Sequence, residues 1–334
     1  MTIRVRKQLW ATLALAFVLL NFVAYRHAYR MTHFVSEGER TRSPEKLSAL
    51  ERVDALVTGV EIPKPVNTST PDASYRTATI KTTGGHRLEA WDIPAGDGAD
   101  VAVMFDGYAV SKQCGLREAT VFHELGQRVL LVDFRGAGGS DGNVTTLGWR
   151  EAKDVAAAMS WAHNQWPQSK LILCGKSMGA VAALRAIATE GVEPSALLME
   201  APFDRLLTTV GHRYNAMGLP SFPFAQLLVF WGGVQLGFNG FAHNPVEYAR
   251  TAHCRTLVIS GAEDPWAREQ EVRAVAQAVR GPVTVEIFPG VGHGSCCDAA
   301  PEKYGQIVRV WLESVAQSRS LLAETSGVRA VRPR

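Results

Sequence analysis

The stretch Leu171-Ile-Leu-Cys-Gly-Lys-Ser-Met-Gly-Ala180 decides the fold of this chain. It begins with a short apolar run typical of a buried strand, and residues 180–190 after it (AVAALRAIATE) have the alanine and leucine content of a helix packed on a sheet. Between the two, Gly-x-Ser-x-Gly indicates a sharp strand-to-helix turn that presents Ser177 as a nucleophile. Gly175 and Gly179 are expected to avoid the Cβ clashes of larger residues in such a turn.

A serine nucleophile needs a general base and an acid that orients the base. Residues 256–260 form an apolar strand-like run that Asp264 follows, and residues 283–288 form another that leads into Gly-Val-Gly-His293-Gly. We predict that His293 takes the proton from Ser177 and that Asp264 holds the imidazole and stabilises its charged form.

Other uses of the same residues remain open at this stage. Asp264 precedes Pro265 and would also suit the cap of a helix that begins there. Asp204, which follows an earlier strand-like run, is the alternative acid. His293 is one of nine histidines, and its position beyond the last strand-like run favours the base. Serine in such a turn can also be purely structural.

The chain order Ser177, Asp264, His293 resembles the α/β-hydrolase superfamily, with matching features from about residue 74 to residue 316. A strand-like run at 101–105 enters Asp106-Gly-Tyr108-Ala, at the position of the family's His-Gly oxyanion loop. The resemblance implies that the backbone N–H groups of Tyr108 and Met178 bind the oxyanion. Asp106 departs from the family pattern, which puts the geometry of this loop in question.

A second motif supports the resemblance. The run Val129-Leu-Leu-Val-Asp133, followed by Phe-Arg-Gly-Ala-Gly-Gly-Ser140, is similar to the DxRGxGxS motif of this superfamily. Residues 145–166 then have helical spacing, and residues 196–199 form the strand-like run after the nucleophile helix.

The strand-like and helical runs alternate in a regular series. Residues 75–81 and 87–93 suggest an antiparallel entry joined by a turn at residues 83–85. Later strands are expected near 101, 129, 171, 196, 256 and 283, with helices near 111, 147, 178, 267 and 301. This rhythm predicts an α/β protein with a mainly parallel, doubly wound sheet, in which the site residues share the rim at the carboxyl ends of the strands.

Between Pro202 and Pro245 the regular alternation of strand-like and helical runs is interrupted, and the segment is rich in aromatic residues. Relatives carry a lid at this point, so we predict a lid insertion at about 203–245 that admits a hydrophobic ester. The alternative is a helical elaboration whose aromatic residues fill a small core of its own.

Residues 9–25 (LWATLALAFVLLNFVAY) form an uncharged stretch of seventeen residues with basic residues on both sides. At about 1.5 Å per residue, the stretch is at the short end of what spans a bilayer. A cleaved signal peptide is the competing interpretation, but residues 24–28 supply charge and bulk where small residues are required. We predict a retained single-pass membrane anchor, and the balanced flanking charge leaves its orientation open.

The expected organisation is an anchor at 1–30, a helix and linker at 31–73, the α/β-hydrolase domain at 74–317, and a flexible basic tail at 318–334. Within 31–73, Ser43-Pro44 is expected to cap a helix that Gly59 ends. The net charge of +3 gives no indication of nucleic-acid binding, and the histidine and cysteine spacings suggest no metal or cofactor site.

The sequence therefore predicts a membrane-anchored serine hydrolase that cleaves a carboxylic ester or thioester through an acyl-serine intermediate. A serine peptidase or amidase with the same triad is one alternative. A catalytically silent, hydrolase-like binding protein is the other, and Asp106 is its only support.

Overall fold

The computed structural model describes residues 3–41 and 47–328. An eight-stranded sheet in the order β1-β2-β4-β3-β5-β6-β7-β8 forms its centre. The first two strands pair antiparallel and β2 pairs antiparallel with β4, whereas all later neighbours are parallel. All eight predicted strands are confirmed: β1 (Arg76–Lys81), β2 (Arg87–Ile93), β3 (Val101–Phe105), β4 (Arg128–Val132), β5 (Leu171–Lys176), β6 (Ala196–Glu200), β7 (Arg255–Gly261) and β8 (Val283–Phe288).

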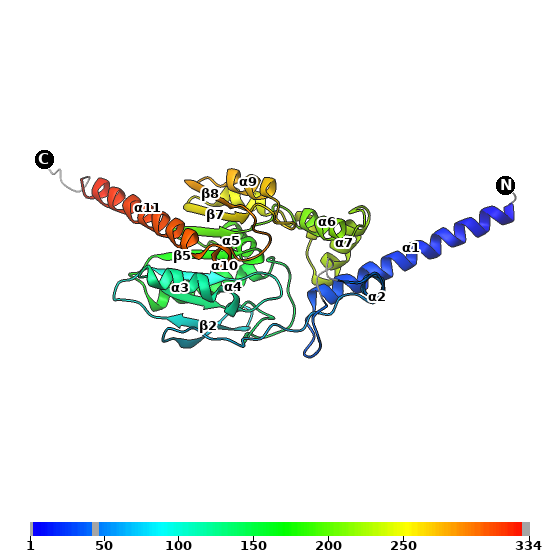
Figure 1. Cartoon of the computed structure of the whole chain (residues 1–334), viewed down its shortest axis with the longest axis horizontal. Helices are drawn as coiled ribbons and strands as arrows, with labels where there is room; N and C mark the ends of the chain where they lie inside the picture. The colour runs from blue at the N-terminus through cyan, green and yellow to red at the C-terminus, as the bar shows by residue number, and fades with distance from the viewer. Residues whose placement is uncertain (1–2, 42–46, 329–334) are drawn as a thin grey trace.

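Helices cover both faces of this sheet (Figure 1). Those of the domain are η2 (Lys112–Gly115), α3 (Leu116–Glu124), α4 (Glu151–Gln165), α5 (Met178–Thr189), α8 (Pro245–Tyr248), η4 (Ala249–Thr251), α9 (Glu269–Ala278), α10 (Cys296–Ala299) and α11 (Pro301–Val328). The insertion between β6 and β7 contributes α6 (Leu206–Ala216), α7 (Phe224–Leu236) and η3 (Gly240–Ala242).

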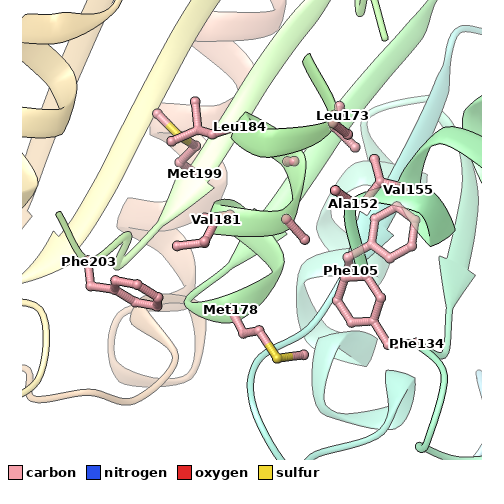
Figure 2. Close-up of a cluster of buried hydrophobic side chains, with 14 of the residues drawn as sticks. Phe105, Phe134, Ala152, Val155, Leu173, Met178, Val181, Leu184, Met199 and Phe203 are labelled. Carbon is pink, nitrogen blue, oxygen red and sulfur yellow. The ribbon is translucent and has the colours of Figure 1, made fainter. Parts of the chain in front are cut away.

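Side-chain alternation along the central strands assigns residues to the two faces of the sheet, because successive residues point in opposite directions. Phe105 and Leu173 pack with α4, α5 and α9, whereas Met104 and Cys174 pack with α3 and α11. Figure 2 shows the first of these cores, where side chains of α5 such as Val181 lie against the sheet. Both faces are buried, so the strands read as nearly continuous apolar runs.

The N-terminal helix α1 (Ile3–Thr32) projects from the domain beside the insertion, and α11 ends on the opposite side of the molecule (Figure 1). The chain directly after α1 holds the last turn of this helix in place: the Phe34 N–H donates to the Asn143 carbonyl at 2.7 Å, and the Val35 N–H donates to the Ile62 carbonyl at 3.0 Å. Ala28 of α1 is 2% exposed and belongs to the main core. The base of α1 is thus part of the folded domain.

Some predicted helix ends differ from the structure. The helix after the DxRGxGxS motif starts at Glu151, because the buried Glu151 carboxylate accepts from the N–H groups of Thr146 and Gly148 and holds residues 145–148 as a loop. The helix α2 (Ala49–Thr58) has its N-cap at Ser48 in a capping box with Glu51, while the predicted cap at residues 43–44 lies outside the described residues.

The predicted tail at 318–334 differs as well. The helix α11 continues to Val328, so the first part of that segment is helical, and residues 329–334 lie outside the described residues.

Candidate active site

Ser177 lies at the turn between β5 and α5 with φ 49° and ψ −112°, a conformation rare for a residue with a side chain. The two flanking glycines make this turn possible. A Cβ on Gly175 would lie 2.5 Å from the Ala180 nitrogen, and one on Gly179 would collide with the Phe105 carbonyl. The sequence argument for these two glycines holds because neighbouring backbone fills the space that a side chain would need.

The three residues predicted as a triad come together at the rim of the sheet. The His293 Nε2 atom lies 3.1 Å from the Ser177 Oγ atom, and the His293 Nδ1 atom lies 2.6 Å from the Asp264 Oδ2 atom. They come from three separate loops, after β5, β7 and β8, which the parallel sheet brings to one edge. The arrangement can pass a proton from the serine hydroxyl to the imidazole.

Asp264 contacts His293 as predicted, but it caps a turn and not a helix that begins at Pro265, because the next helix, α9, begins at Glu269. Its Oδ1 atom accepts from the N–H groups of Trp266 and Ala267 at 2.8 and 2.9 Å, while its Oδ2 atom contacts His293. The alternative acid, Asp204, has its carboxylate 3.6 Å from the Arg205 Nε atom, and no contact with His293 is recorded within residues 3–41 and 47–328.

The predicted oxyanion donors lie beside the serine. Met178 begins α5, where the first N–H groups of a helix have no intrahelical acceptor. The loop after β3 lies against the serine at Gly107, where an added Cβ atom would be 3.5 Å from the Ser177 Cβ atom. Tyr108, Met178, Ser177 and His293 line one cavity. An acyl carbonyl in that cavity would meet both loops.

Asp106 does not face this cavity of the serine. Its side chain points toward Gly115 and lines a second, smaller cavity with Glu118, Lys176 and Glu200. Burial raises the pKa of Asp106 to about 7, and the negative charge of Glu118 acts in the same direction, whereas Lys176 opposes it. The departure from the family pattern therefore alters the interior behind the loop.

This interior holds three carboxyl groups around one ammonium, and we name Asp106, Glu118, Lys176 and Glu200 the rear cluster. The Lys176 Nζ atom lies 3.8 Å from an oxygen of Glu118 and 3.8 Å from one of Glu200. Burial raises the pKa of Glu200 to about 7 despite the nearby lysine. Burial lowers the pKa of Lys176, but the carboxylates outweigh it and the net shift is upward.

The rear cluster also contacts the loop that carries the histidine. The Ser295 hydroxyl donates to Glu118 at 2.7 Å, and the Cys296 N–H donates to Glu200 at 2.8 Å. Sequence analysis did not identify these residues as part of the site. The available signal was a charged residue at the end of each of two buried strands, Lys176 on β5 and Glu200 on β6.

The DxRGxGxS motif supports the site from a distance. Asp133 accepts from the Lys112 N–H at 2.7 Å and pairs with the fully buried Lys112 ammonium at 2.5 Å, while Arg135 pairs with Asp154 of α4. Lys112 begins η2, directly after the oxyanion loop. The motif therefore fixes the segment that follows this loop.

On the other side of the serine, the insertion forms a mostly apolar cavity, which we name the front cavity. Side chains from α6 and α7, together with the last turn of α1, line it: Leu206, Val210, Leu228, Val229, Met31 and Phe203 among others. Phe222, Phe230 and Phe241 of the same insertion are instead exposed. The aromatic stretch thus divides between a cavity wall and an outer surface.

Comparison with known proteins extends these observations. The sequence model of a family described as "Serine aminopeptidase, S33" matches residues 99–223. An uncharacterised protein of Mycobacterium tuberculosis is 29% identical over 223 residues, which make up 65% of this chain and 72% of that protein. An uncharacterised protein of Bacillus subtilis is 23% identical over 244 residues, which make up 72% of this chain and 79% of that protein.

Solved structures show the same architecture. An esterase of Pyrococcus furiosus matches with a TM-score of 0.62 and 23% identity, over 76% of this chain and 99% of the esterase. An esterase from Exiguobacterium antarcticum matches with a TM-score of 0.54 and 19% identity, over 71% of this chain and all of that one. These matches confirm the predicted fold.

Proposed function

We propose that this chain, which belongs to the α/β-hydrolase superfamily, is a serine hydrolase that cleaves a carboxylic ester or thioester. One observation supports this most directly: Ser177, His293 and Asp264 form a continuous series of hydrogen bonds that ends at an apolar cavity. An intact nucleophile, base and orienting acid are what acyl transfer requires.

The proposed reaction follows from this geometry. The Nε2 atom of neutral His293 accepts the Ser177 hydroxyl proton while the Oγ atom attacks the acyl carbonyl carbon, and Asp264 accepts from the Nδ1–H. The backbone N–H groups of Tyr108 and Met178 would stabilise the negative oxygen of the tetrahedral intermediate. The imidazolium then protonates the leaving alcohol or thiol, and an acyl-serine remains. Water, deprotonated by His293, releases the acid and restores the serine.

The front cavity favours a substrate whose acyl group is hydrophobic and is buried in this cavity. Its lining is predominantly apolar, as in most small-molecule sites, and Ser177 lies in its wall. An acyl chain placed there would lie beside Ser177 and between the two helices of the insertion.

We further propose that α1 is a retained membrane anchor. It is the one helix in the described part of the chain that is long and apolar enough to cross a membrane. The C-terminal half of α1 contacts the insertion: the Trp231 Nε1–H donates to Asn21 at 3.1 Å, and the Gln235 amide donates to the Tyr25 carbonyl at 2.8 Å. Removing α1 as a signal sequence would open the wall of the front cavity formed by Ala28 and Met31.

Exposed apolar side chains near the base of α1 agree with a position at a membrane surface. Leu50, Val53 and Val57 are exposed on α2, and Phe230 and Val234 are exposed on α7. Both helices lie beside the base of α1 (Figure 1). Apolar faces of this kind suit the lipid interface.

A serine peptidase or amidase is the second candidate, because the matched family is described as an aminopeptidase and the same triad cleaves amides. Comparing p-nitrophenyl esters with peptide amides separates the two. Hydrolysis of amides at rates equal to those of esters would favour the peptidase. A hydrolase-like binding protein without activity would hydrolyse neither.

The central test is labelling of the purified chain by a fluorophosphonate probe, which reacts with activated serines. We expect Ser177→Ala to abolish labelling, because the attacking oxygen is lost. Ser160→Ala, the same change at an exposed position of α4, serves as control and should label fully. Equal labelling of Ser177→Ala and the parent would refute the assignment.

A further inference from the structure

The insertion carries one cation toward the front cavity. Arg213 of α6 lines both the front cavity and the larger groove outside it, and Ser177 and His293 line the same two spaces. Its guanidinium carbon lies 5.1 Å from the centre of a Trp266 ring and 5.6 Å from that of Tyr108, the predicted oxyanion residue. Arg213 is therefore held between two aromatic rings, next to the position of the scissile bond.

This arginine has no acidic partner within residues 3–41 and 47–328. The acids that line the outer groove are directed to other cations: Asp298 pairs with Arg117 at 2.8 Å, and Asp106 belongs to the rear cluster with Lys176. Burial lowers the pKa of Arg213, and the positive charge of Arg40 lowers it further, against the opposing effect of Tyr108.

A second cation faces the same groove. Arg40 lines it and donates to the Ala109 carbonyl of the oxyanion loop at 3.0 Å. Within the part of the chain that the structure describes, neither guanidinium has a carboxylate partner. Their positive charges repel each other, and that of Arg213 is half-buried, which is costly. A bound anion would remove this cost. The planar fork of N–H donors of a guanidinium matches the oxygens of phosphate.

We propose that Arg213 and Arg40 bind a phosphate on the alcohol portion of the substrate, so that the enzyme acts on phosphate-bearing acyl esters. The acyl chain lies in the front cavity, the ester lies at Ser177, and the phosphate lies in the outer groove that Arg213 and Arg40 both line. This assignment rests on the proposed esterase function and specifies its substrate class.

The test uses two substrates that share an acyl chain and an ester bond: 1-oleoyl-glycerol 3-phosphate and 1-oleoylglycerol. Release of oleate by the full chain in detergent micelles gives kcat/KM for each. We expect the parent to prefer the phosphate ester by about tenfold or more, since a charge-assisted contact contributes about 1.5–3 kcal/mol and 1.4 kcal/mol is a factor of ten. In Arg213→Gln this ratio should fall close to one.

Arg205→Gln is the matched control, because Arg205 lies directly before the same helix, is half-exposed beside Asp204, and lines neither space. It should retain the preference of the parent. An unchanged ratio in Arg213→Gln, or an equal fall in Arg205→Gln, would overturn the proposal. If Arg213→Gln is not labelled by the fluorophosphonate probe, Arg40→Gln replaces it; its side chain is exposed, and its ratio should fall at least threefold. An unchanged ratio there would also overturn the proposal.

Two further measurements locate the source of the phosphate and separate this proposal from the one it rests on. If the ligand is a soluble ester, the enzyme should prefer the water-soluble 1-butyryl-glycerol 3-phosphate over 1-butyrylglycerol to the same degree. If the preference is restricted to the oleoyl pair, the phosphate belongs to a lipid head group. A parent that reacts with the probe and with p-nitrophenyl esters but shows no preference in either pair refutes the phosphate site alone. A parent that reacts with none of them refutes the esterase function itself.

Discussion

The two sides of Ser177 differ in almost every physical respect. In front of it, the insertion and the base of α1 build an apolar cavity whose charged side chain, Arg213, has no acidic partner among the residues that the structure describes. Behind it, the rear cluster gathers three carboxyl groups around the single ammonium of Lys176. On the substrate side, the charge of Arg213 has no acidic partner in the described part of the chain, whereas carboxyl groups outnumber the ammonium group on the supporting side.

This difference assigns different tasks to the two regions. On the substrate side, the proposed phosphate in the outer groove would supply the anion that Arg213 lacks, so the charge of Arg213 would contribute to recognition. The rear cluster is largely buried and contacts the histidine loop through Ser295 and Cys296, so its charge is expected to affect stability and the position of that loop. Substitutions on the two sides should therefore change different measurements.

The largest effect is expected where the two sides meet, at the bond between Asp264 and His293. Asp264→Asn should lower kcat by about 10³- to 10⁴-fold, because the amide no longer favours the productive tautomer of the imidazole or stabilises its charged form. The measurement is hydrolysis of a p-nitrophenyl ester. Asp204→Asn, the same change in the alternative acid, should leave kcat within a few-fold of the parent. The reverse order of effects would assign the triad to Asp204.

A smaller effect, specific to the substrate, is expected in the front cavity. Val210→Phe adds bulk where α6 lines the cavity, and it should lower kcat/KM for long acyl chains about ten- to a hundredfold. Butyrate esters should be much less affected. Val234→Phe makes the same change on the exposed face of α7 and serves as control. Equal losses for short and long chains would show that the acyl group lies elsewhere.

The smallest effect is expected in the rear cluster, and it depends on pH. Because the pKa of Asp106 is raised to about 7 in the folded chain, the folded state retains a proton that the unfolded state releases above about pH 4. The free energy of unfolding therefore falls as pH rises from about 4 to 7.

Asp106→Asn removes the part of this dependence that Asp106 causes, while the part due to Glu200 remains. Relative to the parent, the variant should gain on the order of 1 to 3 kcal/mol between pH 5 and pH 8. The measurement is the thermal unfolding midpoint of both proteins across this range. Asp97→Asn, at an exposed position, should stay parallel to the parent. A constant difference between Asp106→Asn and the parent would show that Asp106 is already ionised at pH 5.

The sequence by itself determined the sheet and the order of the candidate triad. Both follow from local patterns: apolar runs of strand length, helical spacing between them, and glycines where the backbone of the turn at Ser177 leaves no room for a Cβ. Because parallel strands align their carboxyl ends, the position of Ser177, Asp264 and His293 along the chain already implied a common rim.

Only the tertiary structure decided what surrounds that rim. No local pattern indicates that Asp106 points away from the front cavity, that Glu200 and Lys176 meet behind the serine, or that Arg213 has no acidic partner among the described residues. These residues are distant in sequence, and the packing of α1, α6 and the loop after β3 brings them together. Burial and the balance of charge depend on that packing, because they are properties of neighbours in space.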